Sequence, residues 1–283
     1  MGSFKNYALA GILALAASTT AHAADLPAPP PPMPYAPVEV GGGWYLRGDI
    51  GMSNQQVDRL SFVSANGQAV PANLNDANFH TDFVEFDSSV FGGIGVGYQF
   101  NPWLRVDVTG EYRGGASFHG FERSIATPTD IDKYTAIKSE WVGLINAYFD
   151  LGTWHGLTPF VGAGVGFTRT KISSFVDTFV GAGGGIGGGF AADDHTETEL
   201  AWALHAGVAY DVTPNFKVEF AYRYLNLGDG QSGVLTSFDS ATTGRVAVKM
   251  KDLDSHDFKV GLRWMLGAPV MAAAAPAPVM RRF

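Results

Sequence analysis

The stretch from Trp202 to Tyr224, "WALHAGVAYDVTPNFKVEFAYRY", alternates large apolar side chains with charged or small ones on both sides of a "TPN" turn. Because successive side chains of a β-strand point to opposite faces, this period of two predicts a β-hairpin with one apolar and one charged face. The alternation alone does not say which face meets water. A soluble sheet and a sheet surrounded by lipid give the same pattern with the two faces exchanged.

The N-terminal residues predict export from the cytoplasm. A positive charge at Lys5 precedes an apolar run from Tyr7 to Ala17, and Ala21-His22-Ala23 then fits an A-x-A cleavage site. This order is typical of a secretory signal peptide, and the apolar run is too short to span a bilayer. We therefore expect a signal peptide over residues 1–23, cleaved near Ala23/Ala24.

Two further segments have the composition of linkers, and the overall composition excludes several classes of protein. Residues 24–42 are Pro-rich and predict an extended periplasmic linker, and residues 267–283 form an Ala/Pro-rich tail. No later run reaches the roughly 18 apolar residues of a transmembrane helix. The chain has no cysteine and therefore no disulfide framework. Its net charge of −8 gives no reason to expect a nucleic-acid partner.

Eight segments share the alternation of the first hairpin. They lie at 43–53, 90–100, 104–113, 139–151, 158–170, 200–212, 216–227 and 256–266. The fourth is the least regular, because Val142 and Leu144 fall on its polar face. The connections after the second, fourth and sixth segments are short. Those after the others are long, at 54–89, 114–138, 171–199 and 228–255.

Short turns at one end and long loops at the other are typical of outer-membrane β-barrels. The segments are also about 10–13 residues long, against a usual 5–6, and about 9–11 residues cross a bilayer at a tilt. We therefore predict an eight-stranded antiparallel up-and-down transmembrane β-barrel over 43–266, with periplasmic turns and extracellular loops. Because open edges do not occur in hydrocarbon, the first strand must pair with the last. The sequence leaves open whether residues 77–88 add a further strand.

The two faces of the predicted barrel carry different residues. Aromatic residues near the strand ends of the lipid-facing side are expected to form two interfacial girdles. They are Trp44, Tyr98, Phe100, Tyr112, Tyr210, Phe216, Tyr224 and Trp264. The inward face is expected to hold a charge network. Its predicted members are Arg47, Asp49, Arg105, Asp107, Glu111, Arg113, Glu140, His205, Lys217, Glu219, Arg223, Asp257, Lys259 and Arg263.

The predicted interior charges are close to balanced, and buried charges must be paired. An eight-stranded barrel has an interior just wide enough for side chains to occupy. The composition of the interior therefore favours a salt-bridged plug, with a narrow gated pore as the alternative. Inward-facing glycines leave room for long side chains from the opposite strands.

Four phrases carry a resemblance to a known family: "GWYLRGDIG", "NAYFDLGTWHGLTPFVGAGVGF", "WALHAGVAYDVTPNFKVEFAYRYLNLG" and "HDFKVGLRW". The chain resembles the alphaproteobacterial small outer-membrane β-barrels, which include porin-like and immunogenic surface proteins. They are similar in build to the N-terminal barrel of outer-membrane protein A. The resemblance implies a bacterial outer-membrane location and insertion by the outer-membrane assembly machinery. Such barrels usually end on an aromatic residue, whereas here Phe283 follows the tail and Trp264 lies on the last strand.

The most favoured function is non-enzymatic: a structural or surface-interaction role in the envelope. The alternatives are a narrow porin for small polar solutes and a loop-borne receptor for haem or a host ligand. The sequence indicates no catalytic residue, no cofactor-binding residue and no metal ligand. The glycine-rich "GAGVGF" lies inside a strand, and neighbouring residues of "SHD" at 255–257 point to opposite faces. The expected partners are outer-membrane lipid, lipopolysaccharide, the assembly machinery and periplasmic chaperones.

Overall fold

The computed structural model describes residues 43–65, 67, 69–71, 74, 78–238 and 246–267. The predicted signal peptide and linker, and the predicted tail beyond residue 267, lie outside these residues. Within the described part of the chain, no helix is long and apolar enough to cross a membrane.

The described residues form one antiparallel sheet of eleven strands. The strands are β1 (Gly43–Ser64), β2 (Phe79–Phe86), β3 (Ser89–Asn101), β4 (Leu104–Ser124), β5 (Ile131–Asp150), β6 (Leu157–Val180), β7 (Ile186–Ala191), β8 (His195–Thr213), β9 (Phe216–Gln231), β10 (Leu235–Ser237) and β11 (Val246–Met265).

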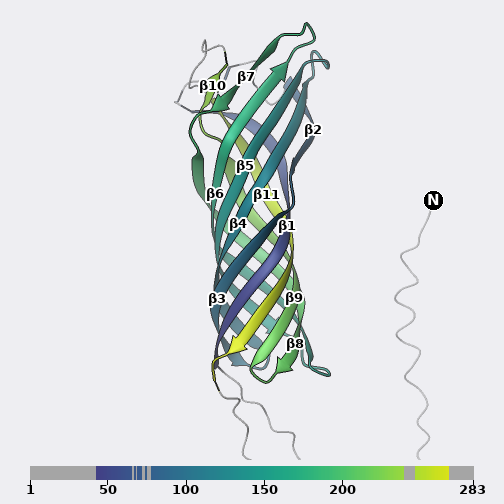
Figure 1. Ribbon diagram of the computed structural model, residues 1–283, viewed down its shortest axis with the longest axis vertical. Coiled ribbons are helices and arrows are strands. Elements are labelled where there is room, and N and C mark those ends of the chain that lie inside the picture. The colour runs from purple at the N-terminus through teal and green to yellow at the C-terminus, as the bar shows by residue number, and fades with distance from the viewer. Residues whose placement is uncertain are drawn as a thin grey trace, which may run out of the picture. The chain divides into compact units, whose positions relative to one another are not determined.

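Eight of these strands form a closed ring in the order β1, β3, β4, β5, β6, β8, β9 and β11. The first and last strands close the ring, with Leu46 opposite Trp264 and Ile50 opposite Val260. Figure 1 shows β1 and β11 side by side along the barrel wall. The predicted fold class, an eight-stranded antiparallel barrel, is confirmed.

The three remaining strands lie at one end of the ring. β2 pairs with β4 and, at Glu85, with β1. It therefore lies between the same two strands as β3, but nearer this end of the ring. β7 pairs with β6, and β10 pairs with β7 (Figure 1). Residues 79–86 therefore do add a strand. We call this the loop end, and we call the opposite end, with connections at 102–103, 151–156 and 214–215, the short-turn end.

The predicted strands are too short at the loop end, and the predicted long loops are correspondingly wrong in extent. β1 continues to Ser64 rather than Ser53, and only residues 125–130 separate β4 from β5. Irregularities let the strands continue: the register shifts between Arg113 and Ala116, and Ser174 on β6 has a φ of 52°. A strand of 20 residues that is tilted by about 40° from the barrel axis spans about 50 Å of barrel height. This is roughly twice the height of a lipid-facing band.

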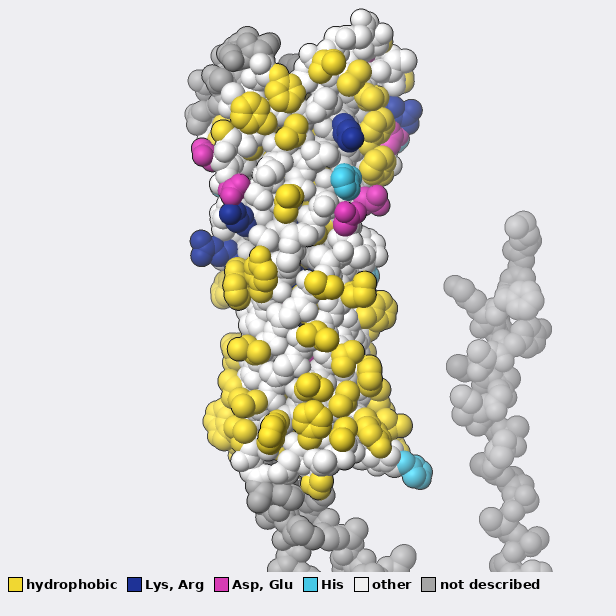
Figure 2. Space-filling model, viewed as in Figure 1, with side chains coloured by type: hydrophobic (Ala, Val, Ile, Leu, Met, Phe, Trp, Pro, Cys, Tyr) yellow, Lys and Arg dark blue, Asp and Glu magenta, His cyan; other side chains and the backbone are white. Residues whose placement is uncertain are grey.

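The orientation of the side chains explains this extra height. Up to Met52 on β1, apolar side chains point outward and polar ones inward. Beyond it the pattern reverses: Asn54 and Gln56 are exposed on the outside, while Val57 and Leu60 are buried inside. Figure 2 shows the lower wall covered by hydrophobic side chains, and charged side chains mixed with further hydrophobic ones above it. The lower part therefore has the surface of a lipid-embedded barrel, and the upper part that of a barrel in water.

The buried core lies inside the ring. A cluster of apolar side chains from all the long strands packs there, including Val57, Leu60, Phe86, Phe118, Tyr134, Val142, Leu144, Ile172, Phe175, Leu225, Leu227, Val248, Met250 and Leu253. Val142 and Leu144, the two residues that made the fourth predicted strand irregular, do point inward and belong to this core. The interior therefore combines an apolar core with a polar region nearer the short-turn end.

Candidate functional site

The structure places thirteen of the fourteen predicted network residues in the barrel interior, all less than 9% exposed. The exception is Lys217, whose side chain is partly exposed at the short-turn end. Lys217 lies directly opposite Asp211 beside the β8–β9 turn, and it pairs with that carboxylate. Lys217 still lies on the inward face, opposite Arg263 on β11, but at the mouth of the barrel, where its side chain is only partly buried.

The network has three linked clusters, and the one nearest the loop end contains two arginines and two carboxylates. Arg223 on β9 donates to Glu111 on β4 through Nη1 (2.9 Å) and Nη2 (2.7 Å), and to Asp257 on β11 through Nε (2.8 Å). Arg113 binds the same two carboxylates, with its Nη2 2.9 Å from Glu111 Oε1. Each carboxylate is thus shared by two guanidinium groups, one from its own or the neighbouring strand and one from across the barrel.

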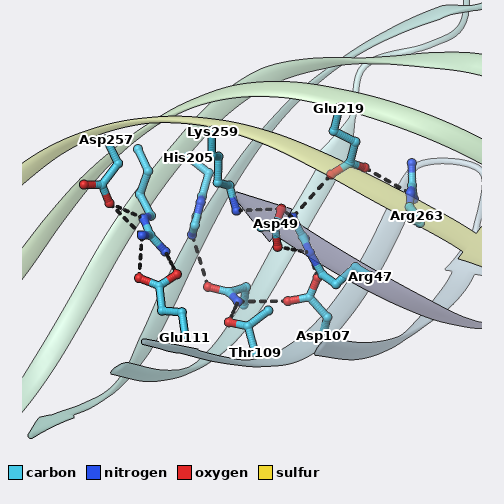
Figure 3. A network of polar contacts seen from close by, with 12 residues as sticks. Arg47, Asp49, Asp107, Thr109, Glu111, His205, Glu219, Asp257, Lys259 and Arg263 are labelled. Carbon is cyan, nitrogen blue, oxygen red and sulfur yellow. Dashed lines mark hydrogen bonds and ion pairs between the residues drawn. The ribbon is translucent and has the colours of Figure 1, made fainter. Parts of the chain in front are cut away.

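The middle cluster is organised around Arg47 (Figure 3). Arg47 donates to Asp49 on its own strand (Nη2 to Oδ1, 2.8 Å) and to Asp107 on β4 (Nη1 to Oδ2, 2.7 Å). Asp107 also accepts from Asn146 Nδ2 at 2.8 Å, and His205 Nε2 lies 3.1 Å from Asn146 Oδ1. This chain of contacts joins β1, β4, β5 and β8.

The cluster nearest the short-turn end surrounds Glu219. Its carboxylate lies 3.0 Å from Arg263 Nε, 3.4 Å from Arg47 Nη2 and 3.5 Å from Arg105 Nη2. Arg105 also donates to Asp150 through Nε (3.2 Å), and its guanidinium lies 4.0 Å from the centre of the Tyr148 ring. Cation–π contact and ion pairing together hold Arg105 across the lumen.

The sequence-based prediction missed three members of this interior. Lys138 Nζ lies 2.7 Å from Glu140 Oε1, Gln55 donates to the same carboxylate, and Asp150 pairs with Arg105. Lys138 and Gln55 lie beyond the predicted strand ends, so a longer period-two search would have found them. In the polar region the described chain then has seven cations, Arg47, Arg105, Arg113, Lys138, Arg223, Lys259 and Arg263. They are matched by seven carboxylates, Asp49, Asp107, Glu111, Glu140, Asp150, Glu219 and Asp257.

Inward-facing glycines make room for these side chains. A Cβ atom on Gly97 would lie 2.3 Å from the Tyr45 ring, and one on Gly164 would lie 2.1 Å from Asn146 Oδ1. Real Cβ contacts are never this short, so large side chains from neighbouring strands cover these two glycines. The interior is packed at these levels rather than open.

The predicted aromatic girdle residues lie on the outer wall. Trp44, Tyr98, Phe100, Tyr210, Phe216 and Trp264 lie toward the short-turn end, and Tyr112 and Tyr224 lie toward the loop end. Neighbouring rings are in contact: Trp44 with Tyr98 at 5.3 Å between centroids, and Tyr112 with Trp141 at 4.9 Å. Trp141 and Trp202 add to the second group, where Trp202 lies 5.3 Å from Tyr224. Two aromatic levels therefore bound the apolar band.

The arrangement does not assemble a hydrolase triad at "SHD". Ser255 and Asp257 face the interior, where Ser255 Oγ donates to Asp257 Oδ1 at 2.6 Å. His256 faces outward, with its Nδ1 2.6 Å from the Tyr222 hydroxyl. The part of the chain that the structure describes also contains no group of three or more His, Cys, Asp or Glu residues suited to a metal ion.

Comparison with known proteins assigns the chain to a family. The family model of the outer membrane protein beta-barrel domain matches residues 8–266. An uncharacterized protein of Brucella abortus is 30% identical over 224 residues, covering 76% of this chain and 78% of that protein. A putative adhesin of Rickettsia prowazekii is 27% identical, covering 78% and 86%. The outer membrane protein PagN of Salmonella typhimurium is 26% identical, covering 66% and 75%.

Solved structures of small barrels also align with the chain. Neisserial surface protein A aligns with a TM-score of 0.41 and 18% identity, covering 80% of this chain and 99% of that one. The outer membrane protein OprG from Pseudomonas aeruginosa aligns with a TM-score of 0.45 and 13% identity, covering 80% and 97%. From the family match over residues 8–266, the chain belongs to the outer membrane protein beta-barrel domain family and is a protein of the bacterial outer membrane.

Proposed function

We propose that this protein is a closed, non-enzymatic outer-membrane barrel that presents its upper wall and loop end as an interaction surface. The observation that carries the proposal is the occupied interior. The ion-pair network spans the lumen in the lower part, and the apolar core lies above it. A path for solutes would have to cross both layers.

The charge balance of the interior supports closure over conduction. The polar region has as many buried cations as carboxylates, and most of them are in direct contact. A selective pore uses a ring of charges of one sign facing water. Paired charges that lie across the lumen from one another instead link opposite walls, and separating them would expose each to an uncompensated desolvation cost.

The loop end supplies the proposed interaction surface. Large apolar side chains are exposed there, and they are Phe83, Ile125, Ile186, Phe190, Val234 and Phe238. Exposed apolar groups outside the lipid band favour contact with another macromolecule. The similarity to a protein named a putative adhesin in Rickettsia supports the same role. We propose a protein surface with apolar side chains as the partner.

The outer wall above the aromatic level also suits the expected envelope partners. Arg169 lies opposite Trp141 on the neighbouring strand, and Lys171 is exposed one step further from the apolar band. Cations at this height favour contact with the phosphates of lipopolysaccharide. We further propose that β11, which ends beside Trp264, carries the signal read by the assembly machinery and that periplasmic chaperones escort the chain.

Closure is tested by single-channel recording with the refolded mature protein in planar lipid bilayers. The expected result is no conductance from protein shown to be folded by its heat-dependent shift in gel mobility. A variant without the arginines of one cluster, Arg113→Ala with Arg223→Ala, is also expected to stay silent because the other two clusters and the apolar core remain. Discrete, reproducible conductance steps from the unchanged protein would overturn the proposal in favour of a narrow porin.

The surface role is tested separately with proteoliposomes on cultured host cells. Ile186→Asp with Phe238→Asp places charges in the exposed apolar surface and is expected to reduce adhesion. Thr196→Asp, on an exposed position of β8, adds a charge without removing an apolar group and serves as the matched control. Equal adhesion of all three proteins would refute an apolar contact surface at the loop end.

A further inference from the structure

A cavity of about 610 Å³ lies at the loop end, above the apolar core. Its lining combines carboxylates with aromatic rings: Asp132 and Asp177, Phe62, Phe79 and Phe179, and the core residue Leu235. This volume is in the range of small-molecule sites, which lie at about 300–1,000 Å³. The cavity is distinct from the ion-pair network described above and shares no residue with it.

Two carboxylates in this cavity are buried, and no cation is paired with either of them among the residues that the structure describes. Asp177 is 8% exposed and Asp132 is 6% exposed. Asp177 Oδ1 has no hydrogen-bond partner among the described residues. The charged groups that act on Asp177 are Asp132 and Glu122, and those that act on Asp132 are Glu122 and Asp130. All of these described neighbours are acidic, so the described part of the cavity lining is negatively charged.

The strand register explains why these acids meet. Glu122 on β4 lies directly opposite Asp132 on β5, and Asp177 on β6 lies opposite Tyr134, two residues along β5. Like charges on neighbouring positions of one sheet face destabilise the sheet. Glu122 accepts hydrogen bonds from Thr81 and Tyr134, whereas Asp177 faces the cavity. The fold therefore holds carboxylates where a cation from outside would stabilise them.

The aromatic rings that line the cavity indicate which kind of cation it would bind. The rings of Phe62 and Phe79 lie 6.3 Å apart between centroids, and Phe179 lies opposite Asp132 on β6. Aromatic faces attract cations and cover apolar groups. A hydrated metal ion gains little from such walls, since hard divalent ions take six to eight oxygen ligands.

We propose that the loop-end cavity is a binding site for a small organic cation with an apolar body. Its ammonium or guanidinium group lies between Asp132 and Asp177, and its apolar part packs against the three phenylalanine rings. This site goes beyond the proposed surface role and does not depend on it. A cavity closed below by core residues is suited to capture rather than passage.

The protonation of the site predicts that ligand binding releases a proton, which can be measured. Burial and the acidic neighbours raise the pKa of Asp177 to about 8 and that of Asp132 to about 6. The empty site therefore carries a proton on Asp177 at pH 7. A bound cation favours the ionised carboxylate, so binding must release close to one proton per ligand at this pH.

The test is isothermal titration calorimetry of the refolded protein with 2-phenylethylammonium, in two buffers of different ionisation enthalpy. We expect saturable binding with release of about one proton, and at least about tenfold weaker binding of the neutral isostere 2-phenylethanol. Asp177→Asn and Asp132→Asn should each weaken binding, and Asp177→Asn should also abolish the proton release. Asp194→Asn, an exposed acid paired with Lys171, is the control and should change nothing.

Three outcomes would overturn the proposal. Equal binding of the alcohol would show a purely apolar pocket. Unchanged binding by both Asn variants would place the ligand elsewhere, for example in the detergent. Calcium binding that displaces the amine and is lost in Asp177→Asn would assign the carboxylates to a metal instead.

Discussion

Replacing Arg223 by methionine is expected to destabilise the folded barrel by about 3–5 kcal/mol, the cost of removing one partner from a buried ion pair. The Arg223 guanidinium donates to both carboxylates of its cluster, to Asp257 on the neighbouring strand and to Glu111 across the lumen. Methionine retains the long apolar stem, so the change removes the charge and its hydrogen bonds with little loss of volume. The two buried carboxylates would then share Arg113 alone.

Two matched variants show how much of this cost arises because the charges are buried and left without a partner. Lys217→Met breaks the partly exposed pair with Asp211 and is expected to cost less than about 1 kcal/mol. Arg223→Met combined with Glu111→Gln restores one carboxylate per guanidinium, and it should recover about 1–3 kcal/mol of the loss, the range of coupling between contacting residues.

The assay is urea unfolding in lipid vesicles, followed by tryptophan fluorescence at fixed pH and lipid composition. The free energy of unfolding is compared among the four proteins. If Arg223→Met costs no more than Lys217→Met, the interior charges are screened by water. That result would refute the assignment of the network as a dry plug.

Two further perturbations test the packing of the lumen and the acids of the loop end. Gly164→Ala should destabilise the barrel by about 1–3 kcal/mol because its Cβ would overlap Asn146, whereas Gly143→Ala, which meets nothing within 4 Å, should be neutral in the same urea assay. Asp177 is expected to make stability fall as pH rises from about 4 to about 8, because the folded state keeps a proton on this raised pKa that the unfolded state has lost. Asp177→Asn should therefore raise the urea midpoint at pH 8.5 and leave it unchanged at pH 4, and equal pH profiles for the two proteins would contradict a buried, uncompensated carboxylate.

The sequence was sufficient to predict the ring of eight strands, because the period of two persists wherever lipid lies outside and polar groups lie inside. It failed at the loop end for a physical reason. Above the apolar band the outward side chains become polar, as at Asn54, and the inward ones become apolar, as at Val57. A search for outward-facing apolar residues therefore stops near Met52, although the strand continues to Ser64.

The members of the network were easier to predict than their contacts. Any charged residue on the inward face of a predicted strand is a candidate, which identified Glu111 and Arg223. Their hydrogen bond joins residues 112 positions apart in the sequence, and it depends on the register and diameter of the closed ring. The loop-end acids Asp132 and Asp177 were not predicted as interior residues because both lie in segments that were interpreted as loops. Their proximity arises only when β5 and β6 pair beyond the membrane.

Closure of the interior is tested most directly by the accessibility of a thiol placed at its centre. The chain has no cysteine, so Ala203→Cys introduces a single thiol at a buried inward position of β8 beside Leu225. Thr196→Cys, exposed on the same strand, is the reference. We expect a small charged thiol reagent to modify the protein with Thr196→Cys readily and the protein with Ala203→Cys only after unfolding in denaturant. Comparable modification of both folded proteins would show a continuous aqueous path and would contradict the closed barrel.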